Sequence, residues 1–164
     1  MTQTYIYNTL KNNFNDDTYN KLVKQFGKPD VDFMIIHTDL NPQKALELKE
    51  KRKDSSFRKN VLERFNRKCI ITKNQEEECE IAHILPFCEC NELQKYDVNN
   101  GLLLSANIHK LFDKYIFSIN PFTFSIEVKK DKIYTISDYE GMKLNLHIEN
   151  IPYLEKHYNK FLKV

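Results

Sequence analysis

Short apolar runs in the middle of this chain predict two strands followed by a helix. Residues 81–85 form an apolar segment that predicts a buried strand ending near His83. A second apolar run at 101–104 follows the pair Asn99-Asn100, which is typical of a turn. Ser105 is a good helix N-cap, and one side of the helix after it carries Ile108, Leu111 and Phe112.

The flanking patterns predict further helices and short strands. Upstream, we expect a helix over residues 17–26, a strand over 31–36, and helices over 42–53 and 57–65 that are separated at Asp54-Ser55-Ser56. Downstream, we expect an extended segment at 70–71, strands at 116–119, 122–128 and 132–136, an extended piece at 144–146 and a helix after Pro152. The predicted fold class is α+β, with an accessory element at 1–53 and the main domain at 54–164.

The central segment also concentrates polar residues that can do chemistry. His83 ends the first predicted strand, and Asn100 precedes the second. His109 and Asp113 are four residues apart, so they lie one turn apart on the same helix face. The expected strands and helix would therefore bring these four side chains together.

This set of residues suits metal-assisted cleavage of a phosphodiester. An imidazole and a carboxylate can hold a divalent ion and leave positions open for water and phosphate oxygens. A second imidazole can take the proton from an attacking water. The ion offsets the charge that develops on phosphorus and on the leaving oxygen. An Asn beside the second strand can hold the loop backbone and so keep the base in place.

The same residues carry a resemblance to the HNH endonucleases, whose core is the ββα-metal fold. The matching pieces are residues 82–86 (Ala-His-Ile-Leu-Pro), 100–104 (Asn-Gly-Leu-Leu-Leu) and 109–113 (His-Lys-Leu-Phe-Asp). The resemblance extends over roughly residues 55–162. It implies an HNH core with flanking helices and additional short strands.

The resemblance also implies a role for each polar residue. His83 would be the general base and Asn100 would orient it, while His109 and Asp113 would bind Mg²⁺, Mn²⁺ or another divalent ion. The products would carry 5′-phosphate and 3′-hydroxyl ends. Many members have Asp or His just before the base as a further ligand, but this chain has Ala82, which leaves fewer ligands. Glu80 is a candidate to compensate.

Charge is distributed unevenly along the chain. The formal net charge is only +2, but nine basic and three acidic residues lie between Lys49 and Lys68. Such a stripe can neutralise the phosphates of DNA, although a solvated helix face would look the same. Candidate contacts are Arg52, Lys53, Arg58, Lys59, Lys110 and Lys114.

Composition narrows the setting of the protein. No apolar run approaches a membrane span, and the N-terminus lacks the pattern of a signal peptide, so we expect an intracellular protein without membrane association. Cys69, Cys79, Cys88 and Cys90 do not follow paired Cys-x-x-Cys spacing, which disfavours a structural Zn²⁺ site. The other histidines, His37, His147 and His157, are interpreted as surface or hydrogen-bonded residues.

Three functional hypotheses follow. The first is a metal-dependent endonuclease that hydrolyses DNA. The second is a non-catalytic module that binds nucleic acid or protein and keeps a degenerate HNH site, which the Ala82 departure supports. The third is a structural zinc domain that uses the cysteines. A homodimer is compatible with the sequence but not indicated by it.

Overall fold

The structure is a computed structural model that describes residues 42–131 and 133–164, together with Asn20, Lys24 and Gly27. The chain divides into two compact units, Met1–Asp54 and Ser55–Val164. This division lies close to the predicted one, whose interpretation as separate domains stays a prediction. The strand predicted at 31–36 lies outside the described residues. Of the helix predicted at 17–26 only Asn20 and Lys24 are described, and both are helical.

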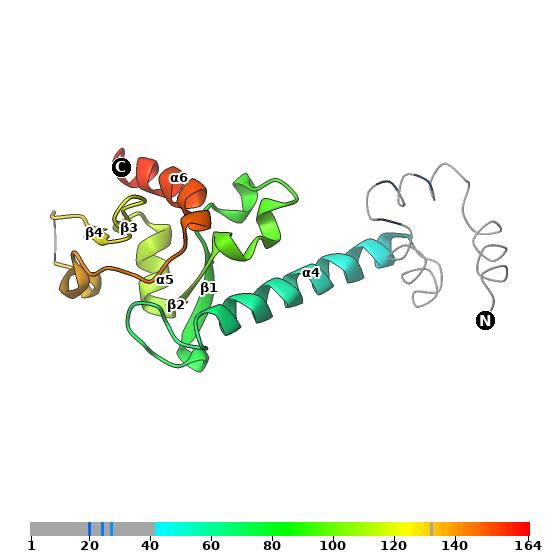
Figure 1. Cartoon of the computed structure of the whole chain (residues 1–164), viewed down its shortest axis with the longest axis horizontal. Coiled ribbons are helices and arrows are strands. Elements are labelled where there is room, and N and C mark those ends of the chain that lie inside the picture. Colours follow the sequence, from blue (N-terminus) through cyan, green and yellow to red (C-terminus); the bar gives the residue numbers. More distant parts are fainter. Residues whose placement is uncertain (1–19, 21–23, 25–26, 28–41, 132) are drawn as a thin grey trace. The chain divides into compact units, whose positions relative to one another are not determined.

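A two-stranded antiparallel hairpin forms the centre of the second unit (Figure 1). Strand β1 (Cys79–His83) pairs with β2 (Gly101–Ser105), so that Ala82 lies opposite Leu102 and His83 opposite Gly101. Strand β2 forms at the predicted apolar run. Strand β1 ends at His83 as predicted but begins at Cys79, so Ile84 and Leu85 follow it. The long loop between them returns the chain through short 3-10 turns.

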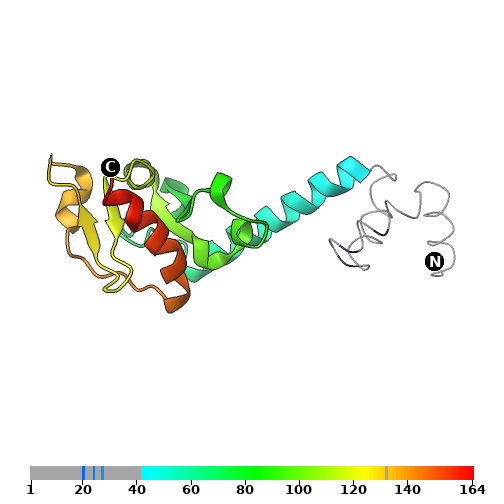
Figure 2. The same ribbon diagram turned by 90° about the horizontal axis from the view of Figure 1, so that it is seen from above.

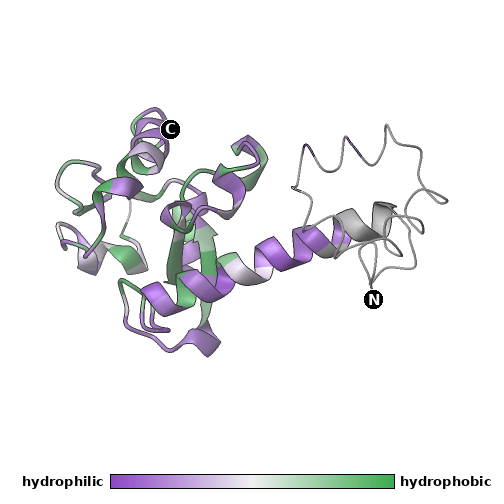
Figure 3. Cartoon of the chain, turned by 45° about the vertical axis from the view of Figure 1, so that its right-hand side comes forward, coloured by the Kyte–Doolittle hydropathy of each residue, from purple (hydrophilic) through white to green (hydrophobic). Residues whose placement is uncertain are grey.

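The two faces of this hairpin are covered by different helices. Side chains alternate along a strand, so Leu102 and Leu104 share one face and Leu103 lies on the other. Leu102 and Leu104 join the core cluster that holds Ile108 and Phe112 of helix α5 (Ala106–Asp113). Leu103 packs with Phe57 and Val61 of helix α4 (Pro42–Arg64). Apolar residues accordingly concentrate in the hairpin, while most of α4 is hydrophilic (Figure 3).

Helix α4 is continuous, which corrects the predicted interruption at Asp54-Ser55-Ser56. Asp and Ser are less favourable than Ala in a helix interior by only a few tenths of a kcal/mol each. This segment contains no Gly or Pro, whose larger penalties would end a helix. The buried residues Phe57 and Val61 directly follow this segment. Their packing stabilises the helix enough for it to continue across the Asp and Ser residues.

The C-terminal part closes the core behind α5. Strand β3 (Phe117–Ile119) pairs with β4 (Ile126–Val128), and helix α6 (Ile151–Phe161) packs on β3, as Figures 1 and 2 show from two directions. The strand predicted at 132–136 is wrong, because residues Thr135–Tyr139 form a 3-10 turn. The extended segments expected at 70–71 and 144–146 are a turn and an irregular stretch.

The predicted α+β class is confirmed by these helices and small antiparallel sheets. None of the helices in the described part of the chain has the length and apolar character needed to cross a bilayer.

Candidate active site

His83 is the last residue of β1, and its ring is held on several sides. The ring stacks on Phe57 with centroids 4.9 Å apart and meets the edge of Phe87 at 5.5 Å. Its Nε2 lies 2.9 Å from the carbonyl oxygen of Lys95. Because a carbonyl oxygen only accepts, Nε2 carries the hydrogen of the neutral ring and donates it. The lone pair of Nδ1 therefore remains able to accept a proton.

The contact between Phe57 and His83 depends on the absence of a side chain at Gly101. A Cβ at this position would lie 2.6 Å from Val61 Cγ2 and 3.0 Å from Phe57 Cζ. Any larger residue would push α4 away from β2, since real Cβ contacts are essentially never shorter than 3.0 Å. Gly101 thus lets the helix approach closely enough for Phe57 to support the His83 ring.

Asn100 is fully buried and braces the loop that faces His83. Its Oδ1 accepts from the backbone N–H of Leu85 at 2.7 Å. Its Nδ2 lies within donating distance of three acceptors, the carbonyl oxygens of Leu85 (3.3 Å) and Gln94 (3.2 Å) and the Cys90 Sγ (3.2 Å). Gln94 directly precedes Lys95, whose carbonyl contacts His83. Asn100 therefore joins both ends of the loop that orients the His83 ring.

His109 lies on α5 between two carboxylates. Its Nε2 is 3.4 Å from Asp113 Oδ2, as expected for residues one helical turn apart. Its Nδ1 is 2.7 Å from Glu80 Oε2 on β1, a contact of hydrogen-bond length. The His109 side chain is 19% exposed, whereas Glu80 and Asp113 are more than half exposed. Both carboxylates thus stay hydrated while the ring is largely enclosed.

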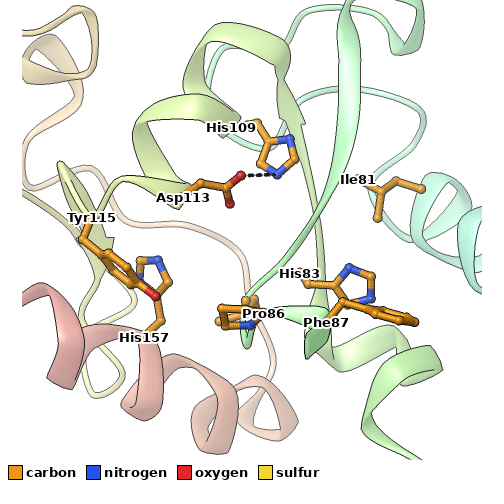
Figure 4. A pocket seen from close by; sticks show the side chains of 9 residues that line it. Ile81, His83, Pro86, Phe87, His109, Asp113, Tyr115 and His157 are labelled. Atoms are coloured by element: carbon orange, nitrogen blue, oxygen red, sulfur yellow. Dashed lines mark ion pairs between the residues drawn. The ribbon is translucent and has the colours of Figure 1, made fainter. Parts of the chain in front are cut away.

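One pocket of about 340 Å³ brings His83, His109 and Asp113 together. Figure 4 shows His83 and Phe87 on one side of it, Tyr115 and His157 on the other, and the His109–Asp113 pair between them. The sequence-predicted base and the predicted metal ligands therefore face a common space. Asn100 does not line this pocket and acts on it only through the loop.

His157 forms part of the pocket wall but has its hydrogen bonds satisfied within the protein. It is buried, with Nδ1 2.8 Å from Ser118 Oγ and Nε2 3.2 Å from the carbonyl oxygen of Phe112. Burial lowers the pKa of His157 to about 4, against a smaller opposing effect of the Phe112 carbonyl. The ring is therefore neutral at physiological pH, in line with its interpretation as a hydrogen-bonded residue.

The His109–Asp113 pair fits a divalent ion. Donor atoms 3.4 Å apart can both lie about 2.1 Å from one ion, a usual bond length for such ions in proteins. Within the described residues, no group of three or more His, Cys, Asp or Glu side chains forms a metal site. An ion bound here would have two protein donors and several positions for water or substrate oxygens.

The candidate DNA-binding residues divide into several groups. Lys110 and Lys114 are exposed on α5, next in sequence to His109 and Asp113. Lys59 is exposed and lies 3.9 Å from Glu63, and Arg58 is also exposed. Arg52 and Lys53 belong to the first compact unit, where Lys53 pairs with Glu50 at 3.4 Å.

Arg64 of the basic stripe has a structural role instead. Its guanidinium donates to Asn99 Oδ1 at 2.8 Å and to Asn150 Oδ1 at 3.0 Å. It thereby connects α4 to the segment before β2 and to the start of α6. The stripe as counted in the sequence therefore overstates the charge available for phosphates.

Sequence reasoning missed two residues of the pocket wall and undervalued Glu80, which lies outside the wall but contacts His109. Phe87 and Tyr115 line the pocket, but no spacing pattern marks either of them. Glu80 was considered only as a substitute metal ligand. Glu80 lies two residues before Ala82, so both residues lie on the same face of the strand. This period of two is the sequence signal that could have predicted the contact of Glu80 with α5.

The segment that carries these residues also matches a known family model. Residues 69–120 match the family model described as HNH endonuclease. The matched segment contains β1, β2 and α5 and therefore all four of the predicted site residues. No curated protein matches the chain.

Proposed function

We propose that this chain, which carries an HNH endonuclease domain over residues 69–120, hydrolyses phosphodiester bonds of DNA in a reaction that depends on a divalent ion. The observation that supports this most directly is the shared pocket. It combines an imidazole with a free acceptor nitrogen and, separately, an imidazole–carboxylate pair with the spacing for an ion. General base and metal site are the two parts that such hydrolysis requires.

His83 acts as the general base. The Lys95 carbonyl holds the Nε2–H, so Nδ1 takes the proton from a water that attacks phosphorus. The new bond joins the water oxygen to phosphorus, and the bond to the 3′ oxygen breaks. That oxygen leaves as an alkoxide and takes a proton from solvent, which yields 5′-phosphate and 3′-hydroxyl ends.

The remaining residues position the reactants. Phe57 and Phe87 hold the plane of the His83 ring. Asn100 holds the Gln94 carbonyl, directly before the Lys95 carbonyl that contacts the ring. His109 and Asp113 would hold the ion. When bound, Mg²⁺ or Mn²⁺ supplies positive charge that stabilises the transition state. Lys110 and Lys114, exposed beside the ligands, contact neighbouring phosphates.

Nicking of supercoiled plasmid tests this function. We expect the full chain to nick in Mg²⁺ or Mn²⁺ and to lose this activity in EDTA. His83→Ala should lower the rate at least 100-fold, since a general base contributes roughly 10²–10⁴-fold. His147→Ala is the matched control, because His147 is exposed and lies outside the pocket. Equal nicking by His83→Ala and the native chain would refute the assignment of the base.

A second candidate function rests on Ala82. This residue is fully buried and has no donor atom, so among the described residues the proposed site offers an ion two protein ligands, His109 and Asp113. A chain that binds Mn²⁺ and DNA but nicks no DNA form with any divalent ion would be a binding module with a degenerate site. The same plasmid assay, combined with a DNA-binding measurement, distinguishes the two functions.

A further inference from the structure

We propose that Glu80 is a positioning residue that selects which nitrogen of His109 faces the divalent ion. The inference rests on the proposed function, because it concerns the same metal site. Glu80 would hold the hydrogen of His109 on Nδ1 and leave the Nε2 lone pair directed toward Asp113. It would act through His109 rather than as a ligand.

The two distances around the His109 ring support this assignment. The Nδ1–Glu80 distance of 2.7 Å is that of a strong charge-assisted hydrogen bond, whereas Nε2–Asp113 is 3.4 Å. An ionised carboxylate has no hydrogen to donate, so the hydrogen in the short contact belongs to Nδ1. Nε2 of the neutral ring is then the nitrogen with a free lone pair, and Asp113 lies beside it. Metal-binding histidines commonly donate their other ring hydrogen to a carboxylate in this way.

The strand explains how Glu80 reaches His109. Residues 80 and 82 lie on the face of β1 that α5 covers, because Glu80 is opposite Leu104 and Ala82 is opposite Leu102. Ala82 is buried beneath the helix and carries no donor. Glu80 lies one strand period away, and its longer side chain contacts the ring. Its side chain is 54% exposed, so the carboxylate contacts solvent as well as the ring.

A purely structural ion pair would have a similar geometry but different consequences. An exposed pair of this kind contributes little to stability and would not affect an ion bound on the far side of the ring. A positioning carboxylate changes metal affinity by roughly 10–100-fold. Metal binding without DNA therefore separates the two interpretations.

The first experiment measures Mn²⁺ binding to the full chain by calorimetry or by electron paramagnetic resonance. We expect Glu80→Ala to raise the Kd for Mn²⁺ by about 10–100-fold. Glu80→Gln should raise it less, since the amide oxygen can still accept from Nδ1. Glu77→Ala is the matched control, because it removes an exposed acid from the same segment without touching His109. Glu80→Ala binding Mn²⁺ as tightly as Glu77→Ala would overturn the proposal.

The second experiment observes the tautomer directly, by ¹⁵N–¹H correlation spectra of the His109 ring in metal-free protein at alkaline pH, where the imidazole is neutral. The native chain and Glu80→Gln should show the Nδ1–H form, and Glu80→Ala should shift toward Nε2–H, the form that free imidazole side chains prefer. An Nε2–H form in the native chain would overturn the inference. So would an unchanged tautomer in Glu80→Ala, because Glu80 would then be a direct ligand or a structural partner.

These readouts keep the two proposals apart. A native chain with the expected tautomer and Mn²⁺ affinities but no nicking would refute the proposed nuclease and leave the role of Glu80 intact. If the native chain nicks plasmid but Glu80→Ala does not change Mn²⁺ binding, the role of Glu80 is refuted and the proposed nuclease remains.

Discussion

Replacing His157 by glutamine should remove a pH-dependent contribution to the stability of this protein. The native ring stacks on Phe112 with centroids 3.8 Å apart and planes 3° apart. Its Nε2–H donates to the Phe112 carbonyl, so Nδ1 accepts from the Ser118 hydroxyl. Both ring nitrogens are thus satisfied in the neutral form. Protonation would add a charge to a side chain that is 3% exposed.

The size of the effect follows from the pKa values of the two states. Burial lowers the pKa of His157 to about 4, with the nearby Lys160 acting in the same direction, while the unfolded value is about 6.5. Between these values the unfolded chain binds a proton that the folded chain does not, so stability falls as pH falls from about 6.5 to about 4. At about 1.4 kcal/mol per pH unit, the loss is about 3 kcal/mol.

Urea denaturation of the native chain and of His157→Gln, from neutral pH to about pH 4, measures this contribution. Carboxylates titrate in the same range in both proteins, so the difference between the two free energies of unfolding isolates His157. We expect this difference to be largest at neutral pH and to shrink by about 3 kcal/mol at the acid end. His147→Gln is the matched control, because it removes an exposed imidazole.

A constant difference between native and His157→Gln across this range would refute the reasoning. An independent check needs no variant. The His157 ring resonances in the native chain should titrate with a midpoint near 4. A midpoint near the ordinary value of 6.5 would show that the ring is not held neutral by burial.

Two further substitutions test the supports of the His83 ring. Asn100→Ala should abolish nicking and destabilise the fold by about 1–3 kcal/mol or more in urea, because it leaves the buried Leu85 N–H without its acceptor; an active, fully stable variant would contradict the role of Asn100. Gly101→Ala should destabilise by about 1–3 kcal/mol through overpacking against Val61 and slow nicking by moving Phe57. Adding Val61→Ala to Gly101→Ala should restore part of the stability and part of the nicking rate. If the losses of the two substitutions simply add, the steric explanation is wrong.

The sequence predicts the strand–strand–helix core well, because local signals coincide there. Apolar runs, the Asn99-Asn100 turn and the Ser105 cap position all indicate the elements that the structure contains. Even so, Ser105 makes no capping hydrogen bond; its hydroxyl instead lies 3.3 Å from Thr72 Oγ1. The position of a helix start was thus predictable, but the partner of the capping side chain was not.

Predictions failed where packing outweighs weak local preferences. Asp54-Ser55-Ser56 indicated a helix break, yet the burial of Phe57 and Val61 on the hairpin favours one helix through α4. Residues 132–136 have strand-like composition, but Thr135–Tyr139 form a 3-10 turn in which only Ile136 is buried. The sequence places Arg64 in the basic stripe, as a charge available for phosphates. Its partners Asn99 and Asn150 lie far along the chain, so the stripe gave no sign of its structural role.

The three histidines around the pocket differ in which ring nitrogens the protein occupies, and the proposed mechanism follows from this difference. The Lys95 carbonyl occupies Nε2 of His83 and leaves Nδ1 as a proton acceptor. Glu80 occupies Nδ1 of His109 and leaves Nε2 for an ion. Ser118 and Phe112 occupy both nitrogens of His157, which leaves it no part in proton transfer or metal binding.

Residues distant in the sequence set each of these states. Glu80 is 29 positions from His109, and Phe112 is 45 positions from His157. Spacing within a motif can therefore identify histidines that lie at one site. It cannot tell which of them is the base and which is a metal ligand. In this chain the distinction depends on two features. One is the Lys95 carbonyl, which follows the Gln94 carbonyl that Asn100 holds, and the other is the Glu80 carboxylate, one strand period from Ala82. Disturbing either should therefore change the role of a histidine without moving it out of the pocket.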